Sequence, residues 1–218
     1  MKIFVTLGLY LTIFASSALP LTIDFDSNTT WIRAPDPSDP SKTTSIGSYQ
    51  TEHSYSAFDW TFTGGPAMRK TVSVVDGFAG ALGTYSWKLR DEASVSWTAT
   101  YSGSADISDV SFAVRRWDAG PSPDFSVSYS TDGGTTFSLA GTINNATVDN
   151  SSDWLTFDVF SGVLSKDIVV KVEANGTTER ILIDDFTFSS AAVPESGTTV
   201  AFLGLAAFGL ILFRRFQT

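Results

Sequence analysis

The stretch DFSVSYSTDGGTTF, residues 124–137, decides the fold class. Within it the large side chains of Phe125, Val127 and Tyr129 alternate with serines, and this period of two indicates a half-buried antiparallel strand. Residues 131–134 (Thr-Asp-Gly-Gly) then interrupt the alternation with residue types that favour a hairpin turn. The stretch therefore predicts a strand that enters a tight turn.

The same alternation recurs along the middle of the chain. Three further runs show it: Val95–Tyr101, Leu155–Val159 and Ile168–Val172. Turn residues lie between the runs, and Asn175-Gly176 predicts a second hairpin turn, whereas the prolines of Ala34–Pro40 predict a surface loop. No convincing helical period is found outside the two terminal segments. Many short strands with regular turns predict an all-β jelly-roll sandwich over residues 19–190.

Three segments of the second half also carry a family resemblance. DFSVSYSTDGGTTF, DWLTFDVF and DIVVKVEANGTTERILIDDFTF resemble jelly-roll modules of the galactose-binding-like type from secreted bacterial proteins. In those modules a strand enters an S-x-D-G-G-x-x-[WF] hairpin, and the last strand carries an I-D-[DN]-[IF] core. The resemblance spans residues 90–190 and implies the jelly-roll fold. It leaves the function open, because such modules serve as sugar binders, protein partners or spacers.

Composition excludes several classes of function. Of the 218 residues 43% are hydrophobic, which is enough for a buried core, and the net charge is −9. An acidic chain is a poor partner for nucleic acid, so we expect none. Between residues 19 and 193 there are 11 basic and 22 acidic residues, which makes the net charge of this body −11. The chain has no cysteine, so disulfides and thiolate catalysis are excluded.

The N-terminus has the three parts of a secretory signal peptide. Lys2 precedes the apolar stretch Ile3–Phe14, and the small residues Ser16 and Ala18 follow it. We therefore predict a signal peptide over residues 1–18, with cleavage after Ala18. The alternative is an N-terminal anchor that is never cut.

The C-terminus ends in an apolar run closed by two arginines. The run Val200–Phe213 is 14 residues long, which is short of the roughly 20 that span a bilayer comfortably. Arg214 and Arg215 follow it and should stay on the cytoplasmic side, where they stop the segment in the membrane. This pattern predicts a transmembrane segment within residues 191–218.

A short motif precedes that run, and Pro194 holds it extended. The motif consists of Val193, Pro194, Glu195, Ser196 and Gly197. Together with the apolar run and the arginines it closely resembles the PEP-CTERM family of sorting signals, in the VPDSG variant, with Glu195 in place of Asp. The resemblance implies that an exosortase, a membrane transpeptidase, recognises the motif and removes the span. It also implies a transient stay in the inner membrane of a Gram-negative bacterium, followed by display at the cell surface or in the extracellular matrix. The alternative is an ordinary membrane anchor.

The sequence predicts no enzyme. A Ser-His-Asp group needs a histidine, and the only one, His53, lies in a polar stretch without a nucleophile motif. One histidine and no cysteine cannot build a histidine-rich metal site. No local pattern selects a carboxylate pair for glycoside hydrolysis.

Two weaker patterns concern binding. Asp24 and Asp26 on the first strand could meet Asp184 and Asp185 on the last strand and hold a structural Ca²⁺, or they could cap turns and face solvent. We expect no cofactor and no dependence on a metal. Trp117, next to arginine and aspartate residues, could stack on a sugar ring or plug one end of the sandwich.

Two functional hypotheses follow from these patterns. The first is a non-enzymatic protein of the envelope or extracellular matrix that an exosortase processes. The second is a carbohydrate-binding module for an exopolysaccharide or an environmental glycan.

Overall fold

The computed structural model describes ten segments of the chain: residues 19–27, 30–33, 35–36, 39–43, 53–64, 67–70, 81–89, 95–117, 119–177 and 179–190. The predicted signal peptide and the predicted sorting signal lie outside these segments, so both stay predictions. Within the described segments no helix is long and apolar enough to cross a membrane.

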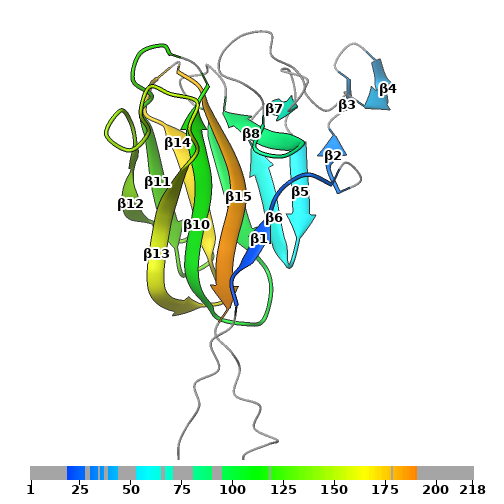
Figure 1. The fold of residues 1–218 in the computed structure, drawn as a ribbon. Helices are drawn as coiled ribbons and strands as arrows, with labels where there is room; N and C mark the ends of the chain where they lie inside the picture. The colour runs from blue at the N-terminus through cyan, green and yellow to red at the C-terminus, as the bar shows by residue number, and fades with distance from the viewer. Residues whose placement is uncertain are drawn as a thin grey trace, which may run out of the picture. The chain divides into compact units, whose positions relative to one another are not determined.

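The described chain folds into strands that form two antiparallel sheets and a small hairpin (Figure 1). The first, named the β10 sheet, has the order β13 (Leu155–Ser165), β10 (Ile107–Arg116), β15 (Ile181–Ser190), β8 (Tyr85–Leu89) and β7 (Ala67–Lys70), with β1 (Leu21–Ile23) also paired to β15. The second, named the β14 sheet, has the order β12 (Ser138–Ile143), β11 (Phe125–Ser130), β14 (Val169–Ala174), β9 (Ser96–Tyr101), β6 (Trp60–Gly64), β5 (His53–Ala57) and β2 (Ile32–Arg33). The hairpin consists of β3 (Pro35–Asp36) and β4 (Asp39–Thr43).

The connections between the sheets give the fold its jelly-roll-like character. From β8 onward the chain passes from one sheet to the other at every step except the hairpin of β11 and β12. As a result β10 pairs with β13 on one side and β15 on the other, although both follow much later in the sequence. This arrangement confirms the predicted all-β sandwich.

Aromatic side chains fill the space between the two sheets. Trp60, Phe62 and Trp97 of the β14 sheet are fully buried, as are Trp87 and Phe186 of the β10 sheet. The ring centroids of Trp60 and Phe186 are 4.7 Å apart in an edge-to-face arrangement. Burial of this apolar area is the main force that holds the sheets together.

The hairpin predicted from residues 124–137 is present between β11 and β12. Asp132 accepts hydrogen bonds from Ser130 Oγ at 2.6 Å and from the Thr136 backbone N–H at 2.8 Å. These donors, Ser130 first, lower the pKa of Asp132 to about 2. Gly133 and Gly134 have φ values of 70° and 91°, which side chains rarely adopt.

Two local predictions were wrong. Asn175-Gly176 makes a turn, but it joins β14 to β15 in the other sheet and so is not a hairpin. Ala34–Pro40 is more than a loop, because β3 lies within it and pairs with β4, which begins there at Asp39, and both strands contain a proline. Both strands of a two-stranded sheet are edges, and an edge strand tolerates the missing N–H of proline.

Candidate functional site

The outer face of the β10 sheet, turned away from the β14 sheet, divides into two halves. Alternation along β10 turns Val110, Phe112 and Val114 to the core and the residues between them outward. The closed half consists of outward side chains that are at most 1% exposed: Ser86, Lys88, Arg115, Trp117, Leu182 and Asp184. The open half consists of outward side chains that are half-buried or exposed: Asp109, Ser111, Asp158, Ser161, Thr187 and Ser189.

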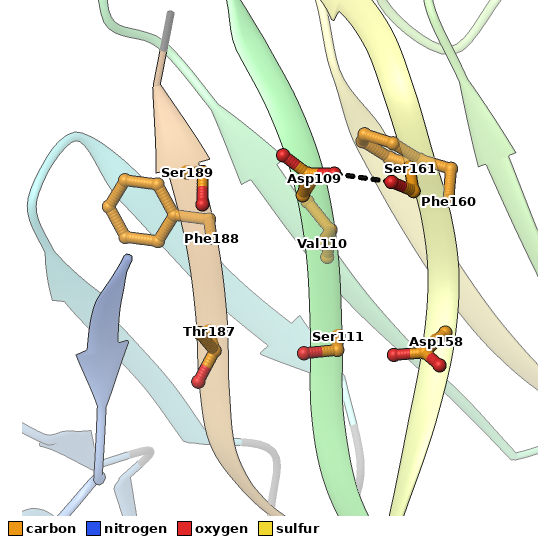
Figure 2. A pocket seen from close by; sticks show the side chains of 9 residues that line it. All are labelled: Asp109, Val110, Ser111, Asp158, Phe160, Ser161, Thr187, Phe188 and Ser189. Atoms are coloured by element: carbon orange, nitrogen blue, oxygen red, sulfur yellow. Dashed lines mark hydrogen bonds between the residues drawn. The ribbon is translucent and has the colours of Figure 1, made fainter. Parts of the chain in front are cut away.

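The open half lines a hollow of about 260 Å³ (Figure 2). Its six polar residues form two rows across three neighbouring strands: Thr187, Ser111 and Asp158 in one, and Ser189, Asp109 and Ser161 in the other. Val110, Phe160 and Phe188 complete the lining. The hollow therefore combines carboxylates and hydroxyls with an apolar surface that makes up the larger part of its accessible lining.

Irregular strand pairing shapes this part of the sheet. The register of β10 against β13 shifts between Ile107 and Asp109 and again between Val110 and Ser111. Such bulges bend a strand and turn its side chains in new directions, and they are frequent beside binding sites. Here one lies next to the row of Asp109 and the other lies between the two rows.

Asp109 is held in place by its neighbours. Its carboxylate accepts hydrogen bonds from Ser108 Oγ and Ser161 Oγ, both at 2.6 Å, and from the Gly162 backbone N–H at 3.3 Å. These donors, with Ser108 first, lower the pKa of Asp109 below its ordinary value. Asp109 is therefore a fixed negative charge at one side of the hollow.

Thr187 is also engaged with its neighbours. Its hydroxyl donates to the Asp185 carbonyl oxygen at 3.2 Å and lies 2.9 Å from the Thr22 hydroxyl on β1. By contrast, no hydrogen bond within the described part of the chain involves the side chain of Asp158, Ser111 or Ser189. These three groups are available to a ligand.

The closed half contains the tryptophan that the sequence suggested as a glycan contact. Trp117 is 0% exposed, and Lys88 Nζ lies 3.5 Å from the centroid of its ring. The Arg180 guanidinium lies 5.7 Å from the same centroid. These contacts correct the expectation of an open stacking surface at Trp117, because a cation already covers the ring and no face is left for a sugar. Trp117 is also absent from the core cluster between the sheets, so the structure shows a third arrangement, in which the ring is buried on the outer face of the β10 sheet.

The first pair of calcium candidates serves as turn caps. Asp26 accepts hydrogen bonds from the backbone N–H groups of Thr84 at 2.5 Å and Tyr85 at 3.0 Å. Asp24 accepts one from the backbone N–H of Asp26 at 3.2 Å. Both carboxylates thus fix the chain around β1 and the start of β8.

The second pair lies near the first. Burial raises the pKa of Asp184 to about 7, while Ser86 Oγ and the Asp185 backbone N–H donate to its carboxylate. Burial, followed by the charges of Asp24 and Asp26, raises the pKa of Asp185. The structure therefore gathers the four aspartates, yet no group of three or more His, Asp or Glu side chains among the described residues is arranged to hold a metal ion. The contacts of Asp24 and Asp26 are those of the capping alternative, whereas Asp184 is 1% exposed and so does not face solvent as that alternative expected.

His53 lies far along the other sheet. It is the first residue of β5, and it pairs in register with Arg33 of β2. It does not line the hollow.

Comparison with known proteins finds similarity only among solved structures. No family model and no curated protein matches the chain. A xylan-binding domain of carbohydrate-binding module family 22 is 15% identical, with 63% of this chain and 90% of that chain covered and a TM-score of 0.42. The K2 cleaved adhesin domain of Lys-gingipain is 13% identical, with coverages of 78% and 99% and a TM-score of 0.45. A family 61 module in complex with β-1,4-galactotriose is 15% identical, with coverages of 60% and 88% and a TM-score of 0.40. Similarity this distant carries no argument about a ligand.

Sequence reasoning missed the residues of the hollow. Asp158 was visible as an outward position of the Leu155–Val159 alternation, but nothing in the local pattern set it apart from other exposed carboxylates. Its partners in the rows, Ser111 and Thr187, lie 47 and 29 residues away. Only the strand order brings them together.

Proposed function

We propose that the protein is an exported, non-enzymatic carbohydrate-binding protein whose ligand lies in the hollow of the open half. The observation that carries the proposal is the set of unengaged groups, Asp158, Ser111 and Ser189, on neighbouring strands. Sugar hydroxyls need such acceptors and donors at fixed positions. The hollow is smaller than the roughly 300–1,000 Å³ of pockets that enclose a whole small molecule, which suits a short section of a longer polymer.

The charge state of the hollow supports binding without hydrolysis. Glycoside hydrolysis requires one carboxylic acid that still carries a proton, together with a second carboxylate. Three donors hold Asp109 in its ionised form, so it cannot act as that acid. Asp184, whose pKa is raised, is 1% exposed in the closed half and does not line the hollow.

We propose that residues 191–218 are a sorting signal that determines where the protein is located. The order of motif, apolar run and arginines supports processing by an exosortase after transient anchoring in the inner membrane. The product would then reach the cell surface or the extracellular matrix of a Gram-negative bacterium. A glycan-binding body is consistent with such a destination, because polysaccharide surrounds the protein there.

Affinity electrophoresis against soluble polysaccharides, followed by calorimetry, tests the glycan site. We expect Asp158→Ala and Ser111→Ala to weaken binding, each by about tenfold, which corresponds to the loss of roughly one charged or strong hydrogen bond. Asp153→Ala is the matched control, because it removes an exposed carboxylate that does not line the hollow. Equal binding by Asp158→Ala and wild type would show that the hollow is not the glycan-binding site.

Mass spectrometry of the C-terminal peptide tests whether this sorting signal is processed in a host that carries an exosortase. Wild type should lose its last 20 or so residues, whereas Pro194→Ala and Glu195→Lys should keep them, because they change the motif and leave the apolar run intact. A wild-type chain that still ends at Thr218 would mean that the tail is an ordinary anchor.

A further inference from the structure

The hollow offers many hydrogen-bond acceptors and few donors. The hydroxyl hydrogen of Ser161 is committed to Asp109, and that of Thr187 to the Asp185 carbonyl. Both hydroxyls therefore present only lone pairs to a ligand. The carboxylate of Asp158 is also an acceptor only.

Two donors remain among the polar lining residues. Ser111 and Ser189 each carry a hydroxyl hydrogen that no described residue uses. A ligand rich in donors can satisfy this surface. One that presents mainly acceptors leaves lone pairs facing lone pairs, and such unmatched contacts cost binding energy.

The charge of the hollow favours the same kind of ligand as its hydrogen-bonding groups do. None of its nine lining residues is basic, and two of them, Asp109 and Asp158, are carboxylates. An exposed carboxylate is negative at neutral pH, and the surrounding body has 22 acidic residues against 11 basic ones. The field in the hollow therefore attracts cations and repels anions.

We infer that the hollow selects amino-sugar polymers with free ammonium groups over neutral glycans and excludes acidic glycans. This inference rests on the proposed function and names the class of glycan. A protonated amine supplies three donors and a positive charge, which match the acceptors and the charge of the hollow. It binds beside Asp158, the one lining carboxylate that the described residues leave unengaged. A uronic acid brings a carboxylate to a surface that is already negative.

Calorimetry with the full-length protein and three matched hexasaccharides tests the order of preference. The probes are hexamers of glucosamine, N-acetylglucosamine and glucuronic acid, compared at mildly acidic pH so that the amines are protonated while the carboxylates stay ionised. We expect the glucosamine hexamer to bind at least about fivefold tighter than the neutral one, a difference that corresponds to the free energy of one surface ion pair. The acidic hexamer should not bind.

Two variants with equal net charge locate the effect. Asp158→Asn should lower the affinity for the glucosamine hexamer by about fivefold or more and the affinity for the neutral hexamer by less, because an amide oxygen still accepts hydrogen bonds. Asp153→Asn removes the same charge outside the hollow and should leave both affinities unchanged.

The outcomes separate the inference from the proposed function. If no hexamer binds, the proposed function fails as well. If the neutral hexamer binds as tightly as the glucosamine hexamer, or the acidic hexamer binds, the function stands and the inference is overturned. Equal loss in the two variants would also overturn it, because the attraction would then belong to the whole acidic surface.

Discussion

The closed and open halves of the β10 sheet share the strands β10 and β15 and the same outward alternation, yet they differ in what covers them. In the closed half Lys88, Arg115 and Trp117 are at most 1% exposed, although two of them carry a charge. In the open half Asp158 is exposed and Ser111 is half-buried. Residue type alone therefore does not show which half of the sheet is accessible to a ligand. The tryptophan and arginine that suggest sugar binding lie in the half that is packed shut, while serines and aspartates line the accessible one.

The largest effect we expect is on the packing of the closed half. Trp117→Ala should lower the free energy of unfolding by about 3–5 kcal/mol, because it leaves a cavity and removes the ring under Lys88 Nζ. Urea denaturation measures the change, and Leu139→Ala is the control, since Leu139 is 68% exposed and should cost no more than about 0.5 kcal/mol. A loss below about 1 kcal/mol for Trp117→Ala would mean that packing in the closed half contributes little to stability.

The next effect concerns the buried acid of the closed half. Burial raises the pKa of Asp184 from 3.8 to about 7, so between these values the folded protein holds a proton that the unfolded chain has released. The free energy of unfolding therefore falls as pH rises through this window and levels off above it. From about pH 5 to about pH 7 the loss should be about 2 kcal/mol.

Asp184→Asn provides the control for this titration. The amide has the shape of the acid but no proton to release, so the fall in stability over the same pH range should become shallower. Thermal melts at matched pH values measure both proteins. Parallel curves for the variant and wild type would show that Asp184 is not the titrating group.

The smallest effect concerns the turn between β5 and β6, next to the end of the open half. Phe58 and Asp59 have φ values of 49° and 63°, and this pair of left-handed residues is a type I′ turn that favours Asn-Gly. Ser102 holds the turn through its backbone N–H, 2.9 Å from the Asp59 carbonyl oxygen. Phe58→Asn should therefore raise the free energy of unfolding by about 0.5–1 kcal/mol, as measured in urea.

A loss of stability in Phe58→Asn would instead reduce the difference between the open and closed halves. The ring of Phe58 is 58% exposed, and its centroid lies 6.5 Å from that of Phe188, which lines the hollow. If Phe58→Asn lowers the free energy of unfolding, this contact outweighs the backbone strain. The wall of the open half would then be packed more like the closed half than its exposure indicates.

The strands and the first hairpin could be predicted because their signals are local. Alternation in Val95–Tyr101 and the glycines after Asp132 depend only on near neighbours in the chain, and both predictions are confirmed. The turn at Asn175-Gly176 was recognised, but its connection was not, because the choice of sheet depends on distant strands. Phe58-Asp59 gave only a weak turn signal, since no glycine or asparagine accompanies Asp59.

The candidate site could not be predicted for a related reason. Whether Trp117 is a stacking surface or a plug depends on the burial of its ring, which no short window of sequence determines. The hollow needs β13, β10 and β15 in one order, with bulges that set two rows of polar side chains level with each other. These are tertiary properties, and the sequence shows only their parts.

A titration of the ¹⁵N-labelled protein with the glucosamine hexamer, followed through backbone amide chemical shifts, tests the central claim most directly. We expect shifts that saturate with ligand and cluster on the open half, at Ser111, Asp158 and Thr187, while Lys88 and Leu182 of the closed half stay unchanged. Shifts that cluster instead on the closed half, or no shifts at ligand concentrations in the millimolar range, would contradict it.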